Sequence, residues 1–110
     1  MSGTVPLQIN VDMLHKMREA GESIALLDVR EPWEVNTCVI EGSITIPLGT
    51  LTKRAGELPK DRQIIVVCHH GARSAQATAW LRHNGFDLAT NLAGGIDAWA
   101  CQIDPTMKVY

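Results

Sequence analysis

The sequence predicts an α/β domain with a mainly parallel central sheet and helices on both faces. Short apolar runs typical of buried strands alternate along the chain with segments whose apolar residues follow helical spacing. Strands joined through helices pair in parallel, and the helices then cover both faces. At 110 residues the chain is long enough for one such domain and too short for two. We therefore expect one domain over residues 1–110, with a core over about residues 7–101 and a tail over 102–110.

The first third of the chain holds a helix between two extended segments. Apolar residues recur every three positions after Asn10, which predicts an amphipathic helix over Val11–Ala20 that ends at Gly21. A short extended segment is expected before it, at Leu7–Ile9. The apolar run Ile24–Val29 follows, and its lack of alternation predicts a strand buried on both faces.

Two further strands are predicted in the middle of the chain. Ser43–Ile46 is short and ends at Pro47, which cannot donate to a strand ladder. Leu48–Leu58 predicts a short helix that Gly56 interrupts. The β-branched run within Gln63–Cys68 then predicts the central strand of the sheet.

The last third of the chain is mainly helical. A broad apolar face predicts a helix over Ala72–Asn84. Gly85 can adopt the left-handed backbone conformation that ends many helices. Ala89–Leu92 predicts the last strand. Gly94 and Gly95 then break the chain before a helix of one or two turns, and no conformation is predicted for the tail.

Composition and charge exclude several classes of function. Ten basic and twelve acidic residues give a formal net charge of −2, so the basic excess that a nucleic-acid partner selects is missing. The longest apolar run, Ile64–Cys68, is far below the ~20 residues needed to span a membrane, and residues 1–5 hold no export signal. Three cysteines without a close-spaced pair argue against a disulfide framework or a Cys-x-x-Cys site. We therefore expect a cytoplasmic protein with no nucleic-acid or membrane partner.

The residues after the central strand indicate a nucleophile. Cys68 stands where this strand ends and the next helix begins, which places a thiol at a helix N-terminus and favours its thiolate form. Four residues separate it from Arg73, so a tight loop can direct backbone N–H groups and a guanidinium toward the sulfur. Gly71 permits a sharp turn, and Ser74 can offer its hydroxyl to the sulfur or cap the helix. Because a cation is disfavoured at a helix start, we expect an anion beside Arg73.

Two reactions suit such a thiolate. Phosphoryl transfer needs a carboxylic acid that protonates the leaving group, and the sequence places no acid near the loop. The loop also has one residue fewer than the Cys-x5-Arg loop of phosphatases. Sulfur transfer needs only a thiolate that attacks sulfane sulfur and a ring of donors that holds the persulfide anion. The segment Cys68–Ser74 therefore favours sulfur transfer.

Simpler interpretations stay open for several side chains, and for Cys68 itself the alternative is a buried structural thiol. His69 and His70 suggest a metal site with Cys68, but three consecutive side chains rarely converge on one ion, and no fourth ligand is spaced nearby. We therefore expect the two histidines to line the pocket. Asp28 and Arg30 close a neighbouring strand on the same edge of the sheet, where a solvated ion pair is one interpretation. We interpret Cys38 and Cys101 as structural or surface cysteines, with a resolving thiol as the alternative, and Trp33, Trp80 and Trp99 as packing residues.

Four segments carry a further pattern, in which order and spacing both matter. They are Leu27–Glu34, Ile40–Leu48, Cys68–Ser74 and Asn91–Trp99. Together they resemble the rhodanese family of sulfurtransferases, and its single-domain members in particular. One departure lies at Cys38-Val39-Ile40, where many relatives carry Gly-His-Ile, and it concerns local packing more than the loop.

The resemblance implies a five-stranded, mainly parallel sheet flanked by helices on both faces. It implies that Cys68 is the nucleophile and that Asp28 and Arg30 brace its loop from the neighbouring strand. The residues implied to bind the substrate and hold the persulfide are His69, His70, Gly71, Ala72, Arg73 and Ser74.

We therefore expect a sulfurtransferase of the thiosulfate type. Cys68 takes sulfane sulfur from a small anionic donor such as thiosulfate and passes it to a thiol or cyanide acceptor, with no metal or organic cofactor. Two alternatives stay open. One is a module that carries persulfide to a protein partner or docks on one, and the other is a phosphatase or arsenate reductase on the same scaffold.

Overall fold

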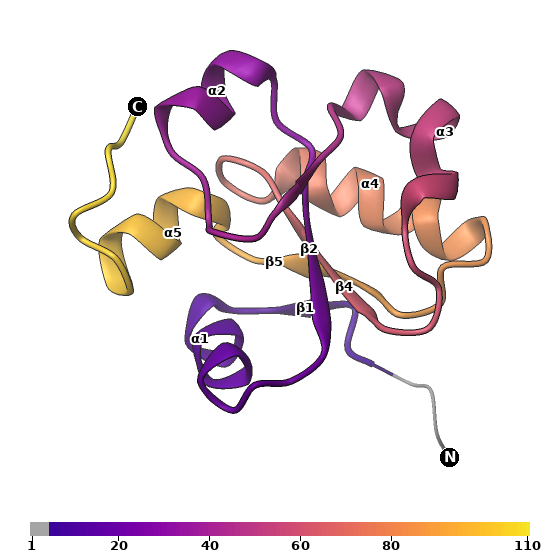
Figure 1. The fold of residues 1–110 in the computed structure, drawn as a ribbon, viewed down its shortest axis with the longest axis horizontal. Coiled ribbons are helices and arrows are strands. Elements are labelled where there is room, and N and C mark those ends of the chain that lie inside the picture. Colours follow the sequence, from indigo (N-terminus) through magenta and orange to yellow (C-terminus); the bar gives the residue numbers. More distant parts are fainter. Residues whose placement is uncertain (1–4) are drawn as a thin grey trace.

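Five strands form one sheet in the order β1-β5-β4-β2-β3, and all neighbouring strands are parallel. The computed structural model describes residues 5–110 (Figure 1). Residues 1–4, part of the segment in which no export signal is expected, lie outside the described residues. The strands are β1 (Gln8–Ile9), β2 (Ile24–Asp28), β3 (Ile44–Thr45), β4 (Gln63–Val67) and β5 (Ala89–Leu92). The predicted strands and their parallel arrangement are confirmed.

The helices confirm the sequence interpretation except at two places. They are α1 (Val11–Glu19), α2 (Pro32–Thr37), α3 (Leu51–Arg54), α4 (Ala72–His83) and α5 (Gly95–Gln102). Turns of 3₁₀ type flank α3, so the helix predicted over Leu48–Leu58 is present only in broken form. The helix α2 was not predicted, although Pro32 at its start and Glu34 three residues after Glu31 are ordinary helix signals; in the structure the Glu31 N–H donates to the Glu34 carboxylate.

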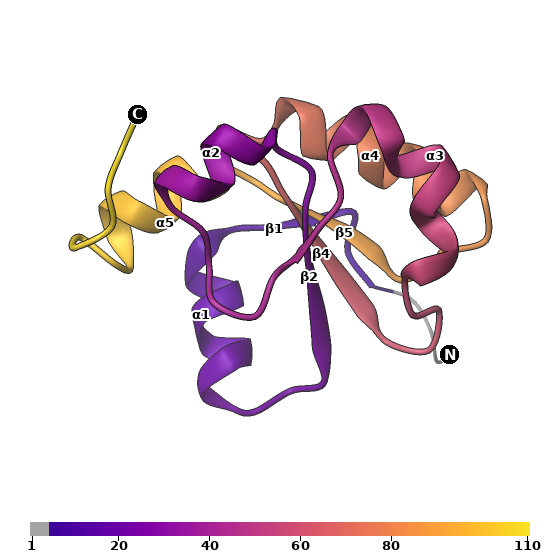
Figure 2. The same ribbon diagram turned by 45° about the horizontal axis from the view of Figure 1, so that its top comes forward.

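Both faces of the sheet are buried under helices. Within β4, Ile64 and Val66 pack into a core with α3 and α4, whereas Ile65 and Val67 pack into a second core with α1 and α5. Figure 2 shows α3 and α4 on one side of the sheet and α1 on the other. Burial on both sides explains why β4 is apolar at every position after its first.

The carboxyl ends of β2 and β4 meet at one edge of the sheet. Asp28 lies opposite Val67 in the parallel register, so the ends of these two strands and the loop after Val67 are neighbours. Segment 103–110, for which no conformation is predicted, folds back along the domain, and Tyr110 packs partly buried against the core near α2 (Figure 1). Within residues 5–110, the structure contains no helix that is long and apolar enough to cross a membrane.

Candidate active site

The sulfur of Cys68 lies at the start of α4, where donors from the following residues reach it. The residue is 1% exposed and comes directly after β4. The backbone N–H of Gly71 donates to Cys68 Sγ at 3.0 Å, and Ser74 Oγ lies 3.3 Å from the same atom. Gly71 adopts a φ of +113° at the N-cap of α4, a conformation that favours glycine. The loop and the first turn of α4 therefore place a backbone N–H and a hydroxyl group beside the sulfur.

Main-chain hydrogen bonds from the start of α5 fix the shape of this loop. The N–H of Ile96 donates to the carbonyl of Cys68 at 2.8 Å, and the N–H of Asp97 donates to the carbonyl of His69 at 3.0 Å. Gly95 has a φ of +58°, and a Cβ built there would overlap both carbonyl groups. The glycines interpreted only as a chain break thus allow α5 to approach the loop.

Asn91 on β5 joins the same network, although it was not predicted as a site residue. Its Nδ2 donates to the carbonyl of Gly71 at 3.3 Å, and its Oδ1 lies within hydrogen-bond distance of Ser74 Oγ. The Ser74 hydroxyl has one hydrogen, so it serves either Asn91 or the sulfur at any moment. A polar residue in a strand predicted to be buried is the signal that could have indicated this role.

Arg73 is bound to a carboxylate of the protein itself. Its two terminal nitrogens lie 2.7 and 2.8 Å from the two carboxylate oxygens of Glu34, whose side chain is 4% exposed. The hydrogen bonds from Arg73 lower the pKa of Glu34 to about 2, against the opposing effect of burial. The expectation of an anion beside Arg73 is thus met by Glu34, an acid that the sequence does not place near the loop but the fold does. Because Glu34 is ionised at neutral pH, it cannot protonate a leaving group in phosphoryl transfer.

The pair Asp28 and Arg30 lies inside the protein, so the interpretation as a solvated ion pair is wrong. Their side chains are 1% and 0% exposed and approach to 2.6 Å. Arg30 also donates to the carbonyls of Cys38 at 2.6 Å and Glu34 at 3.2 Å. Burial lowers the pKa of Arg30, but hydrogen bonds to Asp28 and Tyr110 outweigh this effect and raise it. The pair therefore ties the end of β2 to α2, which carries the partner of Arg73.

Tyr110 links the two ion pairs from the far end of the chain. Arg30 donates to its hydroxyl at 2.9 Å, and the hydroxyl donates to Glu34 at 2.8 Å. Its ring stacks on His69 at 4.1 Å between centroids and meets Trp33 edge-on at 5.4 Å. Burial first, and then the hydrogen bond to Glu34, raise the pKa of Tyr110 to about 12. Nothing in the tail sequence signals this position.

Of the three tryptophans, one departs from the packing interpretation. Trp33 is 61% exposed. Trp99 is buried and Trp80 is packed partly against the core, as expected. Cys101 is exposed, and the half-buried Cys38 lies 3.9 Å from Arg30.

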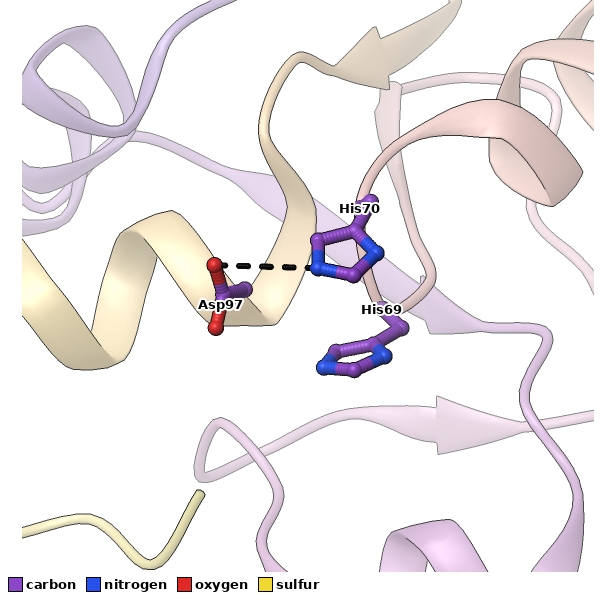
Figure 3. Close-up of side chains that lie close together, drawn as sticks. All are labelled: His69, His70 and Asp97. Atoms are coloured by element: carbon purple, nitrogen blue, oxygen red, sulfur yellow. Dashed lines mark ion pairs between the residues drawn. The ribbon is translucent and has the colours of Figure 1, made fainter. Parts of the chain in front are cut away.

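His69 and His70 lie together at the outer side of the loop. Their rings stack at 4.0 Å between centroids, and His70 is 68% exposed in its side chain. Burial, and then the neighbouring His70, lower the pKa of His69, which favours its neutral form. Asp97 from α5 faces the His70 ring at 3.8 Å (Figure 3). Ala72 is exposed at the first position of α4.

The lowered pKa of Glu34 predicts a specific loss of stability in acid. The carboxyl titrates near 4.5 when unfolded and near 2 when folded, so its stabilising contribution is complete above about pH 5 and is lost as the pH falls toward 2. The shift corresponds to roughly 3 kcal/mol. We expect the free energy of unfolding of Glu34→Gln to fall less between pH 6 and pH 2 than that of the wild type, as measured by urea unfolding. Glu22→Gln, at an exposed carboxylate, should follow the wild type; parallel curves for wild type and Glu34→Gln would contradict the assignment.

The comparison with family models decides the relationship to known proteins. The model described as rhodanese-like domain matches residues 10–102. The chain belongs to the rhodanese-like domain family. Its five-stranded parallel sheet matches a solved rhodanese-related protein from Thermoplasma volcanium with a TM-score of 0.81 and 34% identity, over 89% of this chain and 94% of that one. The resemblance and the fold that it implies are confirmed.

Three curated relatives of this rhodanese-like domain differ in length. A sulfurtransferase of Allochromatium vinosum is 37% identical over 84% of this chain and 87% of its own length. The thiosulfate sulfurtransferase GlpE of Shewanella oneidensis is 34% identical over 83% of this chain and 89% of its own length. The probable adenylyltransferase/sulfurtransferase MoeZ of Mycobacterium tuberculosis is 40% identical over 84% of this chain, which spans only 24% of that protein.

Proposed function

We propose that this rhodanese-like domain is a cytoplasmic sulfurtransferase with Cys68 as its nucleophile. The contact of Cys68 Sγ with the Gly71 N–H and the Ser74 hydroxyl carries the proposal. The Gly71 N–H donates to the sulfur, and the Ser74 hydroxyl can donate to it in place of Asn91. Both groups sit at the start of α4, where the helix dipole also favours negative charge. The names of the relatives from Allochromatium vinosum and Shewanella oneidensis support the same reaction class.

The reaction proceeds through two displacements on sulfur. The Cys68 thiolate attacks the outer sulfur of thiosulfate; a bond forms between the two sulfurs as the sulfur–sulfur bond of thiosulfate breaks, and sulfite leaves with the electron pair. An acceptor thiolate or cyanide then attacks the terminal sulfur of the Cys68 persulfide. Cys68 thiolate is regenerated, and the acceptor leaves as a persulfide or as thiocyanate. No net oxidant or reductant is needed.

The loop and the two ion pairs have separate tasks in this cycle. The donors from Gly71 and Ser74 hold the negative charge on sulfur before and after loading. Arg73 uses two of its N–H groups on Glu34, and the others remain for the oxygens of the donor anion, since 36% of its side chain is exposed. Asp28 and Arg30 brace this arrangement from β2, through the contacts of Arg30 with α2.

Transfer to a protein acceptor is the second candidate. Trp33, 61% exposed and in contact with Tyr110 beside the loop, is the kind of aromatic side chain that protein interfaces favour. The similarity to one quarter of MoeZ, a longer protein, is compatible with such a role. In that case the persulfide forms as above, and a thiolate of the partner attacks its terminal sulfur, so that the partner carries the new persulfide and the Cys68 thiolate is regenerated.

The proposal is tested by the mass of the intact protein after incubation with thiosulfate. We expect an adduct of one sulfur atom that dithiothreitol removes and that peptide mapping places on Cys68. Cys68→Ser should show no adduct, whereas Cys101→Ser, at the exposed cysteine, should load like the wild type. An equal adduct on Cys68→Ser, or no adduct on the wild type, would reject the proposal.

The acceptor is identified with the loaded protein. Rapid turnover with cyanide or a small thiol supports the thiosulfate sulfurtransferase, while a stable persulfide that small acceptors do not discharge supports transfer to a protein. Hydrolysis of an aryl phosphate by the wild type and not by Cys68→Ser would favour the phosphatase alternative instead.

A further inference from the structure

We propose that His69, His70 and Asp97 form a binding site for a divalent transition-metal ion of the zinc type, beside the Cys68 loop. Each residue offers one ligand atom, and these atoms all lie within 4.8 Å of one another. The proposal goes beyond sulfur transfer and does not depend on it. The consecutive histidines alone did not indicate a metal site, because no further ligand is close in sequence; the fold supplies Asp97 from α5.

The chemistry of the three side chains fits such an ion. Two imidazole nitrogens and one carboxylate oxygen are ligands that zinc, copper, nickel and iron accept, unlike magnesium and calcium, which prefer oxygen. Imidazole binds a metal in its neutral form. Three protein ligands leave one or more positions on the ion open to water or to an external ligand.

Contacts outside the ligand atoms hold the backbone of the cluster and the ring of His69 in place. The Asp97 N–H donates to the His69 carbonyl at 3.0 Å, which fixes the start of α5 against the loop. His69 is held between two rings, with His70 at 4.0 Å and Tyr110 at 4.1 Å between centroids. The stacking leaves the edges of the imidazoles free, and Figure 3 shows Asp97 at the edge of the His70 ring.

Binding requires the three ligand atoms, which lie within 4.8 Å of one another, to move closer together. His70 Nε2 and Asp97 Oδ2 are 3.8 Å apart, whereas ligand atoms in a tetrahedral zinc site are separated by about 3.3 Å, given metal–ligand distances of about 2 Å. The side chains of His70 and Asp97 are 68% and 41% exposed, so they can close this difference by rotation. An ion held there would add two positive charges to the outer side of the loop that begins at Cys68.

The test uses zinc chloride and isothermal titration calorimetry on the Cys68→Ser protein, so that the thiol cannot bind the metal. We expect one zinc ion per chain with a dissociation constant in the micromolar range. His70→Ala and Asp97→Asn should each weaken binding at least about tenfold, and His83→Ala, at the C-terminal end of α4, should leave it unchanged. Asp97→Asn keeps the backbone N–H that supports the loop.

A second measurement shows where the ion binds. Zinc should shift the ring resonances of His69 and His70 in NMR spectra and leave those of His15 and His83 in place. Absence of saturable binding, equal affinity in His70→Ala, or shifts confined to His15 or His83 would overturn the proposal. Circular dichroism of each variant checks that weaker binding does not reflect unfolding.

Discussion

Replacement of Asp28 by alanine is expected to lower the free energy of unfolding by about 3–5 kcal/mol. The change leaves the Arg30 guanidinium, which is 0% exposed, without its anionic partner at 2.6 Å. The other contacts of Arg30, to the carbonyls of Cys38 and Glu34 and to the Tyr110 hydroxyl, involve neutral groups and do not replace the lost charge. The loss is a large part of the 5–15 kcal/mol typical of a domain, so Asp28→Ala should melt well below the wild type.

Urea unfolding of Asp28→Ala and of a surface control measures the effect. Arg54 and Glu57 form an ion pair of similar length, 2.9 Å, whose side chains are 42% and 53% exposed. Glu57→Ala should have no measurable effect, because solvent screens such pairs. Asp28→Asn keeps an oxygen that accepts from Arg30 and should fall between wild type and Asp28→Ala. Equal stability of Asp28→Ala and Glu57→Ala would show that the buried pair does not support the fold.

Gly95→Ala is expected to abolish sulfur loading of Cys68 almost completely. The new methyl group would occupy the space of the Cys68 and His69 carbonyls, so the hydrogen bonds from Ile96 and Asp97 to these carbonyls must break or lengthen. The loop then loses the support that keeps the Gly71 N–H directed at the sulfur. We expect the rate of loading from thiosulfate to fall at least about 100-fold, as a displacement of about 1 Å at a reacting group can cause.

Gly21→Ala is the matched control for this variant. Gly21 has a φ of +70°, similar to the +58° of Gly95, but nothing lies within 4 Å of a Cβ built there. Gly21→Ala should therefore cost only the left-handed backbone strain of about 1–2 kcal/mol and load sulfur at the wild-type rate. Loading is measured by intact mass at a temperature where circular dichroism shows both variants folded. Normal loading of folded Gly95→Ala would show that α5 does not position the loop.

The sequence predicted the features that depend on neighbouring residues. The apolar runs of β2 and β4 identify buried strands, and the ten residues from Ile64 to Arg73 contain the strand, the cysteine and the turn in one stretch. The local sequence is sufficient to predict these features, because each of them follows from the spacing of neighbouring side chains. The missed helix α2 is different, since its capping signal was present in the sequence and was not used.

The rest of the site depends on contacts between distant parts of the chain. Arg73 meets Glu34 across 39 positions, and Tyr110 meets Glu34 across 76. Neither contact follows from periodicity or spacing, because the packing of α2 and of the tail on the sheet edge creates them. Sequence alone could therefore predict the Cys68 loop and its turn, but not Glu34, the carboxylate that binds Arg73.

The way in which α5 holds the Cys68 loop has a consequence for how such proteins can diverge. The supporting bonds run from main-chain N–H groups to main-chain carbonyls, and main-chain groups are the same whichever amino acid occupies a position. The side chains at positions 69 and 70 can therefore be exchanged without rebuilding the turn around the sulfur. Sequence change at these two positions is therefore compatible with the same main-chain support from α5.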